Sequence, residues 1–124
     1  MRLARAVGDD AIGGEGSRGW VRVNAKPPAV MAQDVALVVQ HPKGRPLELA
    51  FGAVLSYNGN ATRVRYDMNT EKGSSGSPCL ITALEPFALH NAGGPGDKFQ
   101  YNQGVPLRRL IEHMTTRGVA PFWA

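Results

Sequence analysis

The stretch Gly73-Ser74-Ser75-Gly76-Ser77-Pro78 stands between two strand-like runs of the sequence. Serine is a weak nucleophile until a base removes its proton, and the tetrahedral intermediate of acyl transfer needs backbone N–H donors aimed at its oxyanion. Glycine permits backbone conformations that other residues avoid, so the N–H groups of Gly73 and Ser75 can converge on one point. This composition is compatible with a nucleophile loop, but by itself it is more typical of an ordinary surface loop.

The composition around this stretch favours a single β-rich domain. The chain has 124 residues, of which 43% are hydrophobic and 19% charged. That length suits one domain with a real core and is short for two barrels. The 15 Gly and 9 Pro favour many turns over long helices.

Charge and cysteine content exclude several classes of protein. The formal charge is +4, but the 14 Lys and Arg are scattered and no aromatic residues alternate with them, which argues against nucleic-acid binding. Cys79 is the only cysteine, so no intrachain disulfide and no cysteine-based metal cluster can form, and a reducing, cytoplasmic location is favoured. We expect no metal and no cofactor. No apolar run resembles a signal peptide or a membrane span.

Short strands dominate the chain from Trp20 onward. Residues before that point are rich in Gly, Asp and Ser and indicate a flexible segment over 1–19. Asn58-Gly59-Asn60 between two strand-like runs is a strong hairpin signal. The predicted strands are 20–23, 35–40, 47–57, 61–67, 78–83, 87–90 and 99–105.

The pattern changes at Pro106, where Leu107, Leu110, Ile111 and Met114 recur at helical spacing. Proline is favoured in the first turn of a helix, and Gly118 is placed to end it. Short strands followed by one amphipathic helix predict a small antiparallel barrel with a C-terminal helix.

The loop and its flanks resemble the trypsin-like serine peptidases of bacteria. Gly73 to Pro78 matches their Gly-x-Ser-Gly-Gly/Ser-Pro signature, and four further blocks follow in the family's order: Val38–Gly44, Tyr66-Asp67 with Thr70, Ala88–Gly93 and Asn102–Pro106. The resemblance implies an all-β, antiparallel Greek-key β-barrel with one C-terminal α-helix over residues 20–124. This is the C-terminal barrel of a chymotrypsin-like protease, and residues 1–19 would be the tail of a missing first barrel.

The same resemblance implies the roles of the site residues and the class of substrate. Ser75 would be the nucleophile of a serine endopeptidase, and Gly73 and Ser75 would supply the oxyanion-hole amides. The strand that lines the substrate cleft would contribute His90, Asn91, Ala92 and Gly93, and the substrate would be a peptide or protein. The rival α/β-hydrolase motif, Gly-x-Ser-x-Gly, fails because Ser77 occupies the place of its last glycine.

The sequence lacks the other two members of a catalytic triad at their usual places. In the chymotrypsin order, His and Asp precede the serine by on the order of a hundred residues. His41 precedes Ser75 by only 34 residues within a His-Pro turn, and Asp34 opens a strand of the same barrel, so both are interpreted as structural. We therefore expect a truncated C-terminal half that is inactive without the N-terminal barrel. The alternative is a catalytically inactive module that binds peptides or proteins.

Two residues indicate an acidic substrate side chain. Bacterial glutamyl endopeptidases recognise an acidic P1 residue with a threonine and a histidine near the nucleophile, and this sequence resembles them in having Thr70 five residues before Ser75 and His90 15 residues after it. A hydroxyl and an imidazole can both donate hydrogen bonds to a carboxylate. The opposing interpretation makes Thr70 a strand-end hydroxyl and His90 a wall residue.

Overall fold

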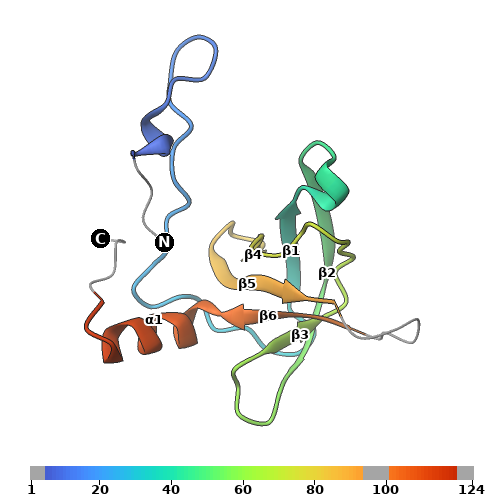
Figure 1. Ribbon diagram of the computed structural model, residues 1–124. Coiled ribbons are helices and arrows are strands. Elements are labelled where there is room, and N and C mark those ends of the chain that lie inside the picture. The colour runs from blue at the N-terminus through green and yellow to red at the C-terminus, as the bar shows by residue number, and fades with distance from the viewer. Residues whose placement is uncertain (1–4, 94–100, 120–124) are drawn as a thin grey trace.

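The computed structural model describes residues 5–93 and 101–119. Within these ranges a short 3-10 turn, η1 (Val7–Asp9), precedes the barrel, and a second, η2 (Pro42–Gly44), follows its first strand. One helix, α1 (Leu107–Thr116), follows the last strand (Figure 1). The strands are β1 (Val35–Gln40), β2 (Glu48–Tyr57), β3 (Val64–Tyr66), β4 (Pro78–Ile81), β5 (Pro86–Ala92) and β6 (Asn102–Pro106).

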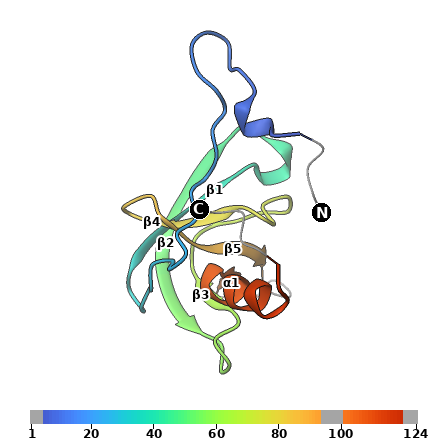
Figure 2. The same cartoon turned by 90° about the vertical axis from the view of Figure 1, so that its left-hand side faces the viewer.

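The strands form a closed antiparallel barrel in the order β1-β2-β3-β6-β5-β4, with β4 returning beside β1. This confirms the predicted antiparallel barrel and its C-terminal helix. The predicted hairpin is also present, since β2 pairs with β3 and Asn58 closes the turn through two hydrogen bonds with Arg63. Helix α1 contacts β5 and β6 at one end of the barrel (Figure 2). No helix in the described ranges is long and apolar enough to span a bilayer.

The strand predicted at residues 20–23 is wrong. The segment has no strand pairing, and Trp20 and Val21 are exposed. A closed barrel offers no free edge to which another strand could add its backbone hydrogen bonds. Residues 20–23 alternate apolar and polar side chains, but they lie on the outside of the barrel. There Trp20 and Val21 line a shallow cavity with Val39 and Leu80.

Residues 5–20 form a loop with its own hydrogen bonds that projects away from the barrel (Figure 1). Gly19 and Arg18 donate backbone hydrogen bonds to Gly8 and Asp10, and the Trp20 ring covers Gly8 so closely that a Cβ there would overlap it. The glycine-rich composition of this stretch predicts no such turn, because the contact between Trp20 and Gly8 leaves no pattern in the local sequence.

Inward-facing residues of the barrel strands, with Val30 and Met68 from adjoining segments, make up the core. Alternate residues of β1, Ala36 and Val38, are fully buried, as expected of a strand with one face inside. Gln40 continues the same face and is 4% exposed, so a polar amide ends this inward row. The cluster comprises Val30, Ala36, Val38, Val54, Val64, Tyr66, Met68, Cys79, Phe87 and Ala88.

Gly52 on β2 allows the chain to turn from β3 toward the serine loop. A Cβ at residue 52 would lie against the Asp67 carboxylate and 2.7 Å from the Met68 nitrogen. The carboxylate occupies this space because it accepts a hydrogen bond from the Ala53 N–H at 2.6 Å. The backbone after β3 can therefore approach β2 only where β2 carries no side chain.

We expect Gly52→Ala to destabilise the fold by about 1–3 kcal/mol, the usual cost of forcing an extra methyl group into a filled space. Gly59→Ala is the matched control, because a Cβ at Gly59 would have nothing within 4 Å. Urea unfolding followed by circular dichroism measures both. Equal midpoints for the two variants would contradict the close approach at Gly52.

Candidate active site

The serine loop joins β3 to β4 as two tight turns. Ser74 N–H donates to the Glu71 carbonyl at 3.1 Å, and Ser77 N–H donates to the Ser74 carbonyl at 3.1 Å. Gly73 and Gly76 take φ values of +99° and +88°, which side chains other than glycine rarely tolerate. The two glycines of the motif are therefore required by the path of the backbone on either side of Ser75.

Backbone hydrogen bonds join the serine loop to strand β5. Gly76 N–H donates to the His90 carbonyl at 2.7 Å, and His90 N–H donates to the Ser77 carbonyl at 2.8 Å. The next residue, Asn91, is the extra residue of a bulge in the β5–β6 ladder. Its carbonyl lies 3.4 Å from the Ser75 hydroxyl. Bulges redirect the chain beside active sites, and this one brings the predicted cleft strand against the predicted nucleophile.

A buried side-chain hydrogen bond fixes the loop from below. Ser74 is fully buried, and its hydroxyl donates to Gln40 Oε1 at 2.6 Å. The Gln40 amide nitrogen donates to the Asn69 carbonyl at 3.0 Å. One glutamine at the end of β1 thus holds the serine loop and the segment that leads into it.

The His-Pro turn after β1 supports the loop from the side. Lys43 N–H donates to the Lys72 carbonyl at 2.8 Å, and a Cβ at Gly73 would lie 3.3 Å from the same nitrogen. The Arg45 guanidinium binds Glu48 at 2.8 Å and Glu71 at 2.9 Å. The hydrogen bonds to Arg45 lower the pKa of both carboxyl groups. These pairs are at the surface, so they orient the turn more than they stabilise it.

Ser75 stands exposed at the tip of this supported loop. In residues 5–93 and 101–119, the N–H groups of Gly73 and Ser75 donate to no protein acceptor, whereas those of Ser74, Gly76 and Ser77 all do. Two unpaired donors therefore flank the hydroxyl on a backbone that is otherwise hydrogen-bonded. Backbone donors without a protein acceptor are what an oxyanion uses when both point at it.

The predicted substrate-binding residues lie on two segments, the end of β5 and the stretch that leads into the serine loop. His90 is 4% exposed, and its Nδ1 lies 2.7 Å from the Tyr66 hydroxyl. Burial lowers the pKa of the His90 imidazole, which favours its neutral form. Thr70 is half-buried in the segment that Gln40 holds. Asn91 and Gly93 are exposed at the end of β5, and Ala92 between them is half-buried and pairs with Gln103.

The structure brings no base to the Ser75 hydroxyl within the described part of the chain. His41 Nδ1 lies 3.1 Å from the Arg45 carbonyl, within its own turn. The Asp34 carboxylate accepts a hydrogen bond from Met31 N–H at 2.7 Å, which makes it a turn cap. No cluster of three or more potential metal ligands occurs among the described residues either.

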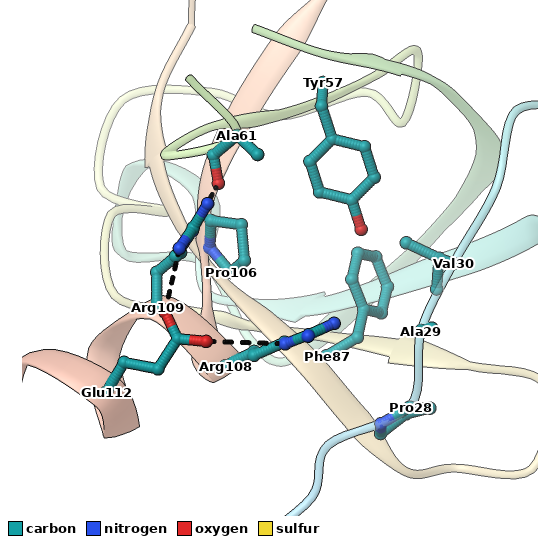
Figure 3. Close-up of a pocket in the computed structure, with 10 residues that line it drawn as sticks. All are labelled: Pro28, Ala29, Val30, Tyr57, Ala61, Phe87, Pro106, Arg108, Arg109 and Glu112. Atoms are coloured by element: carbon teal, nitrogen blue, oxygen red, sulfur yellow. Dashed lines mark hydrogen bonds and ion pairs between the residues drawn. The ribbon is translucent and has the colours of Figure 1, made fainter. Parts of the chain in front are cut away.

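A separate cavity of about 340 Å³ lies between α1, the β2–β3 turn and residues 28–30 (Figure 3). It shares no residue with the serine loop. Arg108 and Arg109 both pair with Glu112, and Arg109 also donates to the carbonyls of Asn60 and Ala61. These bonds join the helix to the hairpin turn, so the charged wall of this cavity is explained as a structural contact.

Three residues that build the site are not predicted from the sequence. Gln40 ends the apolar run of β1, and a polar residue in this inward row is a signal of a buried hydrogen bond. Nothing in the local sequence separates the buried Ser74 from the other residues of its loop. Nothing in the sequence spacing indicates that the Tyr66 hydroxyl meets His90.

We expect Ser74→Ala to destabilise the chain by about 1–3 kcal/mol, because it leaves the buried Gln40 carbonyl oxygen without a donor. Ser75→Ala removes the neighbouring but exposed hydroxyl and should change stability by less than about 0.5 kcal/mol. Urea unfolding of the two variants measures the difference. A Ser75→Ala variant as unstable as Ser74→Ala would contradict the assignment of Ser74 as the anchor.

Comparison with known proteins supports the fold of this chain but identifies no activity. No protein-family model matches the sequence, and no curated protein matches it. Among solved structures, the chain is similar to the crystal structure of Deg5, with a TM-score of 0.60 and 15% sequence identity over 86% of this chain. The chain spans about half of the Deg5 chain, 53% of its length. At this identity the likeness supports the fold alone, a chymotrypsin-like barrel.

Proposed function

We propose that this chain is the C-terminal barrel of a serine endopeptidase, in which Ser75 attacks the peptide bond and forms an acyl-enzyme. The observation that carries this proposal is the exposed Ser75 hydroxyl between the two unpaired N–H groups of Gly73 and Ser75. The rest of the loop is held by buried and backbone hydrogen bonds, so these donors are fixed before a substrate binds. Fixed donors contribute more to an oxyanion than donors that must reorganise.

The proposal assigns the base to a preceding barrel that carries His and Asp. The similarity to a longer chain, of which this one covers 53%, supports it. The outer face of β1 and β2 also supports a preceding barrel. On this face Val35, Leu49 and Phe51 are 55%, 56% and 63% exposed. Neighbouring apolar side chains of this size are usually covered by another part of the protein. Without its base a triad serine loses most of its activity, so the chain alone should not turn over peptides.

We propose an acidic P1 residue as the starting hypothesis for the substrate, recognised by Thr70 and His90. The alternative of a basic P1 residue needs a carboxylate on the pocket floor. Asn69, next to Thr70, carries none, and the Asp67 carboxylate is bound to the Ala53 N–H of β2. Both observations favour an acceptor-bearing P1 side chain over a cationic one.

The second candidate is a non-enzymatic module that uses the same cleft to bind peptides. The observation that favours it is that no described histidine or acidic side chain is hydrogen-bonded to Ser75. The two candidates differ in one chemical property, the reactivity of the Ser75 hydroxyl when the complete protein is present.

A fluorophosphonate probe tests this property. We expect the protein expressed with its preceding coding sequence to be labelled at Ser75, and Ser75→Ala to abolish the labelling. Ser56→Ala, which changes an exposed serine of β2, should leave labelling unchanged. The isolated chain should remain unlabelled, because nothing removes the Ser75 proton. Peptide mapping by mass spectrometry locates the adduct.

Two outcomes would contradict the proposal in different ways. If the longer protein contains no His and Asp in a preceding barrel and is not labelled, the binding module is correct. If the isolated chain is labelled stoichiometrically, the base lies within these 124 residues, and the role of the preceding barrel is wrong.

A further inference from the structure

The cavity beside helix α1 has an apolar floor of buried side chains. It lies between α1, the β2–β3 turn and residues 28–30, and its volume is about 340 Å³ (Figure 3). Val30 and Phe87 are 4% and 3% exposed, and Pro106, which also lines the cavity, is buried. Sites for small molecules typically have volumes of roughly 300–1,000 Å³ and a mostly apolar lining with a few polar groups. The size and the floor of this cavity therefore suit a small ligand.

Arg108 carries a guanidinium that the protein uses only in part. Its Nε lies 3.4 Å from Glu112 Oε1, and its side chain is 75% exposed. Among the described residues, its two terminal nitrogens donate no hydrogen bond, and Figure 3 shows them on the side of Phe87. Arg109 differs, because it donates to Glu112 and to two carbonyls of the hairpin turn. Arg109 thus secures the wall of the cavity, whereas Arg108 retains donors for a ligand.

Tyr57 supplies a second donor from the facing wall (Figure 3). Burial raises the pKa of its phenol, so the hydroxyl keeps its proton at neutral pH. A hydrogen bond with the Val30 backbone lowers the same pKa, which means that the Val30 N–H donates and the hydroxyl oxygen accepts. In the part of the chain that the structure describes, the O–H proton has no acceptor. The hydroxyl can therefore donate to a ligand in the cavity.

The charges of the cavity wall favour a ligand with one negative charge. Arg108 and Arg109 both pair with Glu112, so two guanidinium groups face one carboxylate and a positive charge is left over. At the Tyr57 phenol, the charge of Arg108 has a larger effect on the pKa than that of Asp34. One carboxylate would balance the remaining charge, whereas a dianion would place surplus negative charge beside Glu112. The planar guanidinium also matches the geometry of a carboxylate.

We propose that this cavity binds a carboxylate attached to an apolar group. The carboxylate oxygens accept hydrogen bonds from Arg108 and Tyr57, and the apolar group packs against Phe87. The C-terminal residue of a peptide and a free organic acid share this chemistry. Because the cavity shares no residue with the serine loop, this binding site does not depend on the proposed function.

Titration of the ¹⁵N-labelled chain with phenylpropionate, followed by ¹H–¹⁵N NMR, tests the proposal. We expect shifts at residues 29 and 30 and in the first turn of α1. The uncharged phenylpropionamide should bind at least about tenfold more weakly, since hydrogen bonds to a charged group contribute this much. Arg108→Gln should weaken phenylpropionate binding by a similar factor and should fold, because the side chain is 75% exposed. Arg117→Gln, at an exposed position after α1 that does not line the cavity, is the matched control.

Acetyl-phenylalanine distinguishes the two sources of the carboxylate, because it carries the amide group of a peptide C-terminus. Tighter binding than phenylpropionate would assign the site to a peptide C-terminus, and equal or weaker binding would assign it to a free acid. Equal affinities of phenylpropionate and phenylpropionamide for the wild-type chain would overturn the proposal without any variant. The same holds if Arg108→Gln binds phenylpropionate as tightly as Arg117→Gln does, or if no acid shifts the cavity residues. None of these results bears on the reactivity of Ser75.

Discussion

The hydrogen bond between the buried Ser74 hydroxyl and Gln40 is the contact on which the candidate site depends. It fixes the serine loop to the end of β1, while Gly76 and Ser77 fix it to His90 on β5. Strands β1 and β5 are not neighbours in the barrel, because β4 lies between them. The loop is therefore held from two directions, and Ser75 is the residue left at the surface between these attachments.

This arrangement explains how a small barrel can hold the serine loop in place without an intrachain disulfide. Ser74 and Ser75 are adjacent and chemically identical, yet one is enclosed and the other exposed. The glycines at 73 and 76 permit the turns that separate them. Beneath the loop, the Cys79–Tyr66–His90 chain uses buried polar groups that would be costly if left unpaired. Packing and hydrogen bonding together fix the position of the loop.

Much of the fold could be predicted because its signals are local. The continuous apolar run in residues 35–40, the Asn-Gly turn and the helical spacing after Pro106 each specify one element, and the structure contains all three. Residues 20–23 alternate apolar and polar side chains as a strand does but form no strand, because strand pairing depends on a partner that the local pattern does not contain. The Tyr66–His90 contact could not be predicted for the same reason, since it joins β3 to β5 across the barrel interior.

Amide hydrogen exchange of the serine loop tests the central claim most directly. The structure pairs the N–H groups of Ser74, Gly76 and Ser77 with carbonyls and leaves those of Gly73 and Ser75 without acceptors in the described residues. We therefore expect Gly76 and His90 to exchange slowly, while Gly73 and Ser75 exchange at rates close to those of an unprotected chain. Slow exchange at Gly73 and Ser75 would mean that both donors are already occupied, and would contradict a preformed oxyanion site.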